Sequence, residues 1–414
     1  MSQDIRDFLT PSCELLALGE PTHQEPAFGR VRNRLFAQLV ERGFRSIALE
    51  TDRVAAFAVD DYVRHGVGSL DAVLDEGFTH GFGAQPGNRE LVVWMRDFNR
   101  DREPDDRLAF HGFDTPTENT MAPSPRGYLE HARDYLRLDP GAGLGPGTAS
   151  GAGLGPGTAS GTDLGPGVEL RFDIAELAGE DERWSREQAV LDAESSPGET
   201  PEAVRLRRIA DDLLTRLHLR APELIEATSR AEWFRARARL QAGLGLLRYH
   251  AQAAVQGLGP GDRVSGLLGL RDALMAQNLL DILAVEAGRG PTLVFSHNLH
   301  LQQARSAWAG GDLDCRWNGA GRIVGPLLGE RYVFVAGSLG RSEVLGLADP
   351  APGTYEALLG QGSDAAWALV EPPMPGEGRA RTDPAPQHGY SFDRASFDGA
   401  SAVLHVADGA AAAG

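Results

Sequence analysis

The chain has 414 residues, a formal net charge of −18, and 42% hydrophobic and 24% charged residues, which is a globular composition. The strong negative charge argues against general binding to nucleic-acid phosphates. Its basic residues are all arginine, because the sequence contains no lysine. This excludes the Schiff-base, P-loop and kinase chemistries that need a lysine.

The cysteine content and the lack of long apolar segments point to a compartment. Cys13 and Cys315 are the only cysteines and lie far apart in the sequence, which excludes a disulfide framework and favours a reducing environment. The first ten residues lack the basic and apolar regions of a signal peptide. No apolar run reaches the roughly 18 residues that a membrane helix needs. We therefore expect a cytoplasmic protein with no membrane or nucleic-acid partner, and we predict no oligomeric state.

Short apolar runs alternate with helical patterns along the chain. Strands are predicted over residues 13–18, 46–49, 108–110, 291–295, 332–336 and 402–406. A helix is predicted over residues 25–42 and ends at Gly43, a typical C-terminal cap. This alternation favours an α/β fold with a mostly parallel central sheet flanked by helices.

Two segments are predicted to interrupt this α/β core, which would consist of residues 1–140 and 291–414. Residues 141–167 contain the sequence GAGLGPGTAS twice and a partial third copy. Their glycine and proline content and few apolar residues predict a disordered linker. Residues 168–290 are charged, with apolar residues at helical spacing, and are predicted to form a large helical insertion or cap.

Polar side chains follow four of the predicted strands. Because the carboxyl ends of parallel strands meet at one edge of a sheet, where ligands bind, these side chains are expected to lie together. They are Glu20 and His23 after the first strand, Glu50 after the second, His111 and Asp114 after the third, and His297 and His300 after the fourth.

Arg32 is predicted to point toward the same site. On the helix that follows the first strand, it shares an apolar face with Phe28, Leu35, Phe36 and Leu39. An arginine on such a face needs an anionic partner or ligand, since a buried unpaired charge is costly. The alternative is an arginine whose aliphatic part covers the edge of the core.

Several familiar catalytic motifs are absent. The sequence has no G-x-S-x-G, H-E-x-x-H or G-x-G-x-x-G segment, so a serine α/β-hydrolase, a zincin and a dinucleotide-dependent enzyme have no support. A hydrolase without these motifs would activate water with a histidine that an adjacent carboxylate orients. His23, three residues after Glu20, is the predicted base, and Arg32 is predicted to stabilise the oxyanion.

Five ordered sequence blocks resemble the erythromycin esterase family. They are residues 18–50 (LGEPTHQEPAF, then Arg32 and Ala-Leu-Glu), 90–99 (E-x-x-x-W-x-R-x-x-N), 112–114 (G-x-D), 271–278 (R-D-x-x-M-A-x-N) and 297–300 (H-N-x-H). The blocks extend over nearly the whole chain outside the repeat. The sequence departs from the family pattern in the decapeptide insertion and around residues 78–80, where a tryptophan is expected.

The resemblance implies hydrolysis of the macrolactone ester of erythromycin-like antibiotics, which confers resistance, with a small-molecule macrolide as the partner and no cofactor or metal. It implies that the catalytic residues are His23, Glu20, Glu50, Arg32 and His297. The substrate-binding residues that it implies are His300, Asn298, Asp114 and Arg271.

Two alternatives stay open from the sequence alone. The histidines at positions 297 and 300, together with His23 and two glutamates, are residue types that can hold zinc or manganese in a metal-dependent hydrolase. A macrolide-binding relative that has lost turnover is the second alternative, although the expected polar residues are all present.

Overall fold

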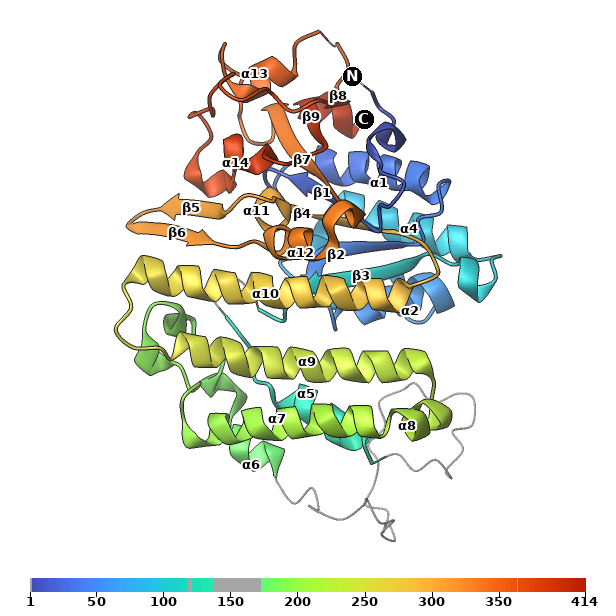
Figure 1. Cartoon of the computed structure of the whole chain (residues 1–414), viewed down its shortest axis with the longest axis vertical. Helices are drawn as coiled ribbons and strands as arrows, with labels where there is room; N and C mark the ends of the chain where they lie inside the picture. The colour runs from blue at the N-terminus through green and yellow to red at the C-terminus, as the bar shows by residue number, and fades with distance from the viewer. Residues whose placement is uncertain (1, 118–120, 138–172, 363) are drawn as a thin grey trace.

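The computed structural model describes residues 2–117, 121–137, 173–362 and 364–414 (Figure 1). The predicted repeat linker, residues 141–167, lies outside these residues.

A seven-stranded sheet forms the centre of the described chain. The strands lie in the order β3-β2-β4-β1-β7-β9-β8, and neighbours are parallel except for β8, which is antiparallel to β9. This confirms the predicted α/β fold with a mostly parallel sheet. The strands are β1 (Leu15–Glu20), β2 (Ser46–Asp52), β3 (Ala109–Asp114), β4 (Thr292–His297), β7 (Tyr332–Arg341), β8 (Trp367–Val370) and β9 (Ala402–Asp408).

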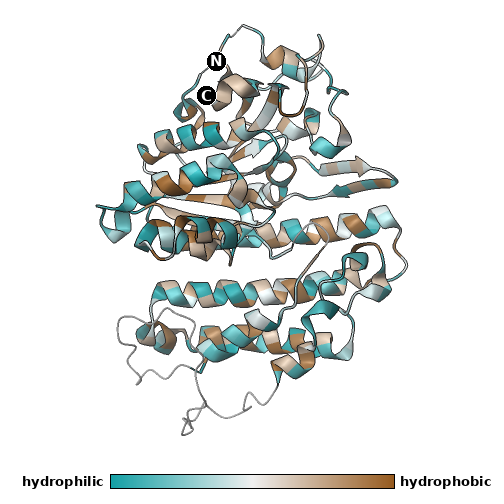
Figure 2. Cartoon of the chain, turned by 180° about the vertical axis from the view of Figure 1, so that it is seen from behind, coloured by the Kyte–Doolittle hydropathy of each residue, from teal (hydrophilic) through white to brown (hydrophobic). Residues whose placement is uncertain are grey.

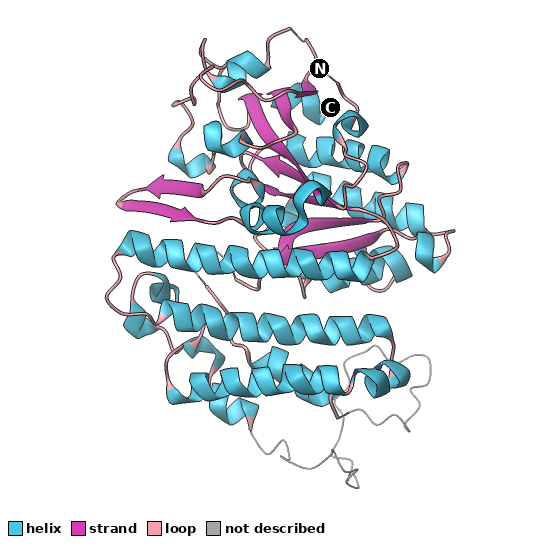
Figure 3. Ribbon diagram, in the orientation of Figure 1, coloured by secondary structure: helices cyan, strands magenta, loops and turns pink. Residues whose placement is uncertain are grey.

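Helices cover both faces of this sheet (Figure 3). Successive side chains of a strand point to opposite faces, so Leu16 and Leu18 of β1 pack into one core and Leu15 and Ala17 into another. The strands are therefore almost wholly apolar, as is usual for a parallel sheet covered on both sides. The helices against the first core are α1 (Pro26–Val40), α2 (Ala56–His65), α3 (Leu70–Glu76), α4 (Pro86–Asn99) and α15 (Gly409–Ala413). The second core is covered by α10 (Pro260–Glu286), α11 (Asn298–Leu301), α12 (Ala320–Leu328), α13 (Tyr355–Leu359) and α14 (Arg394–Phe397).

A helical layer with its own core lies beyond α10 (Figure 1). Leu129, Leu213 and Trp233 belong to that core, and the long helices carry both hydrophobic and hydrophilic residues (Figure 2). The layer is formed by α5 (Arg126–Tyr135), α6 (Ile174–Ala178), α7 (Pro201–Leu219), α8 (Ala221–Ala227) and α9 (Arg230–Ala253). Because α10 contacts both α9 and β3, it connects this layer to the sheet. None of the helices in the described ranges has the length and apolar character that crossing a membrane requires.

The predicted strands end too early in the sequence, and three strands were not predicted. The first four reach Glu20, Asp52, Asp114 and His297, so several polar residues expected after the strands are part of them. Strand β8 and the hairpin of β5 (Ser306–Gly310) and β6 (Leu313–Trp317) were missed. All three are short, and β5 is mostly exposed, so none produces a long apolar run.

Two glycines allow β1 to approach both β7 and the segment that follows β4. A methyl group at Gly19 would lie 2.1 Å from Asn298 Oδ1, and one at Gly337 would lie 2.3 Å from the carbonyl oxygen of Gly19. The side chain of Asn298 donates to the Gly337 carbonyl at 2.8 Å and accepts from the Gly337 N–H at 2.9 Å. This contact fixes the strand ends from which Glu20 and His297 emerge.

Replacing Gly337 by alanine is expected to lower the free energy of unfolding by about 1–3 kcal/mol, because the new methyl group would meet backbone atoms of Gly19 and Glu20. Urea unfolding measures this change. Gly127→Ala is the control, since a methyl group there meets no atom within 4 Å and should leave stability unchanged or slightly higher. Equal stability of the two variants would contradict the close approach of β1 and β7.

Candidate active site

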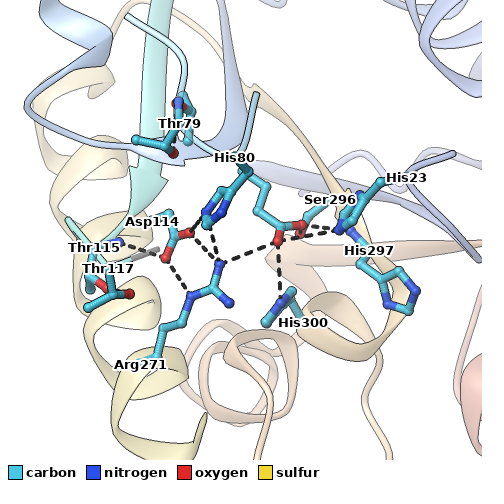
Figure 4. Close-up of polar contacts among 12 residues, drawn as sticks. His23, Thr79, His80, Asp114, Thr115, Thr117, Arg271, Ser296, His297 and His300 are labelled. Atoms are coloured by element: carbon cyan, nitrogen blue, oxygen red, sulfur yellow. Dashed lines mark hydrogen bonds and ion pairs between the residues drawn. The ribbon is translucent and has the colours of Figure 1, made fainter. Parts of the chain in front are cut away.

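The carboxyl ends of four parallel strands bring most of the predicted site residues together (Figure 4). Glu20 and His297 are the last residues of β1 and β4 and are partners in the sheet register. Asp114 is the last residue of β3, and Glu50 lies near the end of β2. His23 follows β1 in the loop before α1. Since the strands are parallel and adjacent, their ends form one polar site.

Glu50 is the centre of this site. Its carboxylate is buried, and Oε2 accepts from Ser296 Oγ at 2.5 Å and from the His297 backbone N–H at 3.0 Å. Burial opposes its ionisation, but the neighbouring cations outweigh burial and hold the pKa of Glu50 well below its ordinary value. Three nitrogen atoms surround the other oxygen, Oε1: His23 Nε2 at 3.6 Å, His300 Nε2 at 3.4 Å and Arg271 Nη2 at 3.5 Å.

His23 is oriented by two carboxylates. Its Nδ1 donates to Glu20 Oε1 at 2.8 Å, and its Nε2 faces Glu50. Burial lowers the pKa of His23, but the negative charges of Glu50 and Glu20 outweigh this effect and raise it to about 9. Burial also raises the pKa of Glu20. The imidazole is therefore mostly protonated at pH 7, and its neutral form increases as the pH approaches 9.

Arg271 and Asp114 form a buried ion pair beside Glu50. Arg271 donates from Nε to Asp114 Oδ1 at 2.9 Å and from Nη2 to Oδ2. Burial opposes ionisation of Asp114, but Arg271 outweighs it, together with a hydrogen bond from His80 Nε2 at 2.9 Å, and lowers the pKa to about 2. Asp114 is fully buried, so the structure shows it holding Arg271. Contact of either residue with substrate stays a prediction.

His80 and Ser296 are site residues that the sequence reasoning missed. His80 has a φ of 58°, which is uncommon for a residue other than glycine, and its ring reaches Asp114. Its only signal was that residues 78–80 depart from the family pattern. Ser296 precedes His297 and donates to Glu50, but a serine at the end of a strand has no distinctive spacing.

His300 and Asp272 form a further histidine–carboxylate pair in the site. His300 Nδ1 donates to Asp272 Oδ1 at 2.9 Å, and its Nε2 faces Glu50. Burial lowers the pKa of His300, but the charges of Asp272 and Glu50 outweigh burial and raise it. Asp272 belongs to the sequence block at residues 271–278, although it was not among the predicted site residues.

His297 and Asn298 connect parts of the backbone around the site. Imidazole Nε2 of His297 donates to the carbonyl oxygens of Pro21 and Gly389 at 3.0 and 3.1 Å, and Nδ1 accepts from the Leu299 N–H. Burial lowers the pKa of His297 to about 3. The Asn298 amide binds the backbone of β7, as described above. The proposed roles of these two residues in catalysis and substrate binding stay predictions, and the geometry shows them fixing the site.

Arg32 is buried, as predicted, but its hydrogen-bond partners are neutral. It donates from Nη1 to Asn88 Oδ1 at 2.8 Å and from Nη2 to Asn33 Oδ1 at 2.8 Å and the Gly87 carbonyl at 3.1 Å. Its guanidinium also lies 4.9 Å from the ring centre of Phe295. Burial lowers its pKa to about 10, so it stays charged at neutral pH.

A small cavity lies between these groups. Arg32 lines it together with Glu20, His23, Glu50 and Phe82, and its size is close to that of one water molecule. The predicted base, two carboxylates and a cation therefore lie around one small space.

His111 does not join the site, which corrects the expectation from the sequence. Its Nε2 donates to Glu286 Oε1 at 2.8 Å, at the last residue of α10. Because β3 continues to Asp114, His111 lies in the middle of the strand and not at its end.

The site contains many titratable groups, but they pair with one another. Within the described ranges, no group of three or more His, Cys, Asp or Glu side chains is arranged to hold a metal ion. His297 uses both of its ring nitrogens in hydrogen bonds to the backbone.

The chain resembles a known protein family and several solved structures. The family model described as erythromycin esterase matches residues 39–388 of the chain. No curated protein matches the chain in sequence.

Solved structures share the fold at low sequence identity. A Bacillus cereus protein has 17% identity, with a TM-score of 0.64 over 98% of this chain and 90% of that one. A mutant of the erythromycin esterase EreC in its open conformation has 17% identity, with a TM-score of 0.62 over 98% of this chain and 94% of that one. A protein described as a succinoglycan biosynthesis protein also has 17% identity, with a TM-score of 0.52 over 82% and 68% of the two chains.

The side chain of His23 is expected to titrate near pH 9, since Glu50 and Glu20 outweigh burial. Nitrogen-15 NMR of the histidine rings measures this pKa, with assignment by His23→Asn. Glu50→Gln should lower the pKa of His23, because it removes one of the two negative charges that raise this pKa against the effect of burial. His65, whose pKa burial lowers, is an internal control in the same spectra. A His23 pKa at or below the ordinary 6.5 would contradict this electrostatic account.

Proposed function

The chain belongs to the erythromycin esterase family, and from this membership and the geometry of its site we propose that it hydrolyses the macrolactone ester of erythromycin-like antibiotics. In a cell this reaction would give resistance to them, and we place it in the cytoplasm. The observation that carries the proposal is the pairing of His23 with Glu20 at the edge of a water-sized cavity.

His23 acts as the general base in this proposal. Glu20 accepts from Nδ1 at 2.8 Å, which leaves Nε2 to take a proton from water once the ring is neutral. The side chain of His23 is 31% exposed, so it is open to water and substrate. Attack on the ester carbonyl then gives a tetrahedral oxyanion.

Cationic groups in the site would stabilise this oxyanion. Arg32 is held at the wall of the cavity by neutral partners, so its charge is not cancelled by a direct ion pair among the described residues. Arg271 is closer to Glu50 but is paired with Asp114. We therefore assign the electrostatic role to Arg32, as a charge fixed in a buried environment.

Removing the base tests the mechanism. His23→Asn is expected to fold normally and to lose at least about a hundredfold in turnover, the lower range of general-base contributions. The assay incubates the protein with fourteen-, fifteen- and sixteen-membered macrolides and detects a mass gain of one water. His65→Asn, at the exposed end of α2, is the matched control and should behave like the parent. Turnover of folded His23→Asn within a few-fold of the parent would place the base elsewhere.

The metal-dependent alternative has a separate test. A chelator should leave most of the hydrolysis intact, because the His and Glu side chains of the site are engaged with one another and with the backbone. Loss of activity with chelator and recovery with a divalent ion would instead support a metal site.

A further inference from the structure

The site contains two histidines in matching surroundings. Each donates from Nδ1 to a carboxylate, His23 to Glu20 at 2.8 Å and His300 to Asp272 at 2.9 Å. Each also directs Nε2 to the same oxygen atom, Oε1 of Glu50, at 3.6 and 3.4 Å. Both rings are labelled in Figure 4. The proposed base accounts for only one of the two pairs.

Asp272 is built to hold His300 in place. It is fully buried, and besides His300 it accepts from Trp317 Nε1 at 2.7 Å and from the Ala320 N–H at 2.8 Å. These donors come from β6 and the start of α12, so they fix the carboxylate from the side opposite α10. With Asp272 accepting from Nδ1, the proton that His300 can give away is on Nε2.

Ester hydrolysis needs a proton donor as well as a base. When the carbon–oxygen bond of the tetrahedral intermediate breaks, the leaving alkoxide of an unactivated alcohol requires a proton. We propose that His300 is the general acid that gives this proton from Nε2, and that Asp272 is the positioning residue that holds His300 for the transfer. This inference rests on the proposed esterase function and extends it.

The protons balance over one turnover. Water gives one proton to His23 Nε2 and forms the bond to the carbonyl carbon. The intermediate then collapses, the bond to the alcohol oxygen breaks, and that oxygen takes the proton of His300 Nε2. The products are a carboxylic acid and an alcohol. His23 now carries one proton more and His300 one fewer, and transfer across Glu50 Oε1, which lies next to both Nε2 atoms, restores the starting state.

The two histidines differ in access as their roles require. The side chain of His23 is 31% exposed, whereas that of His300 is 9% exposed. The more open ring meets water, and the more enclosed ring meets only the part of a substrate that is seated against Glu50. An enclosed donor also delivers its proton to the substrate in preference to bulk water.

Leaving-group dependence tests the assignment. A macrolide or an ethyl ester has a poor leaving group that needs a proton, whereas a p-nitrophenyl ester does not. His300→Gln is expected to lower kcat/KM at least about a hundredfold on the first kind of ester and less than about tenfold on the second. His23→Asn should lower both alike. Asp272→Asn should follow the pattern of His300→Gln with a smaller loss.

Two controls separate positioning from damage to the fold. Trp317→Phe removes one donor to Asp272 but leaves the contact with His300, so any loss of activity should be equal on the two kinds of ester. Nitrogen-15 NMR should show a lower pKa for His300 in Asp272→Asn than in the parent, as expected when the attracting carboxylate becomes neutral. The NMR comparison requires no substrate.

Three results would overturn the inference. Equal losses on both kinds of ester in His300→Gln would make His300 a binding residue, and an unchanged His300 titration in Asp272→Asn would remove the role of Asp272. If the parent protein hydrolyses neither macrolides nor simple esters, the proposed function fails first and proton delivery by His300 fails with it, whereas the NMR result still decides the role of Asp272.

Discussion

A buried carboxylate is stable only where cations or hydrogen-bond donors surround it. The burial of Glu50 imposes this constraint on the rest of the site. Five nitrogen or hydroxyl groups lie within hydrogen-bond or ion-pair distance of its two oxygens. They come from the loop after β1, the end of β4, helix α11 and helix α10. Removing any of these groups would leave a buried charge with fewer partners, which is costly. The polar site and the packing of its elements therefore depend on each other.

Helix α10 extends this dependence to the helical layer. Consecutive residues, Arg271 and Asp272, bind the two halves of the site: Arg271 holds Asp114 and approaches Glu50, and Asp272 holds His300. The same helix contacts α9. Any movement of the helical layer that displaces α10 would shift the cation next to Glu50 and the orientation of His300 together.

The sequence predicts the sheet and the residues at its edge better than it predicts their contacts. Parallel strands and their polar ends follow from apolar runs and spacing, which is why Glu20, His23 and Glu50 were placed together. The strand ends were predicted too early because a polar residue normally ends an apolar run. Here Glu20 and Asp114 remain in the strands because their charges are paired. Glu20 pairs with the nearby His23. The partners of Asp114 are His80 and Arg271, which are distant in the sequence, and a local pattern does not specify them.

The same limit applies to the individual roles of site residues. Asn298 belongs to a sequence block typical of the family, yet its amide is bound by the backbone of β7, and only the close approach at Gly19 and Gly337 explains this. Likewise, helical phase correctly places Arg32 on the buried face. It does not show that the guanidinium donates to the amide of Asn88, from α4, and not to a carboxylate.

The pKa values of three histidines in the site differ because their rings donate to different kinds of acceptor. Glu20 and Asp272 accept from Nδ1 of His23 and His300, and both histidines have raised pKa values. His297, whose ring centre is 5.2 Å from that of His23, instead donates to two backbone carbonyls, and burial lowers its pKa to about 3. A proton is therefore held readily on His23 or His300 but not on His297. Both rings lie next to the same oxygen of Glu50, so two protonated rings would repel each other, and a proton on one ring makes a proton on the other less favourable. This coupling suits a site in which one ring takes a proton while the other gives one away.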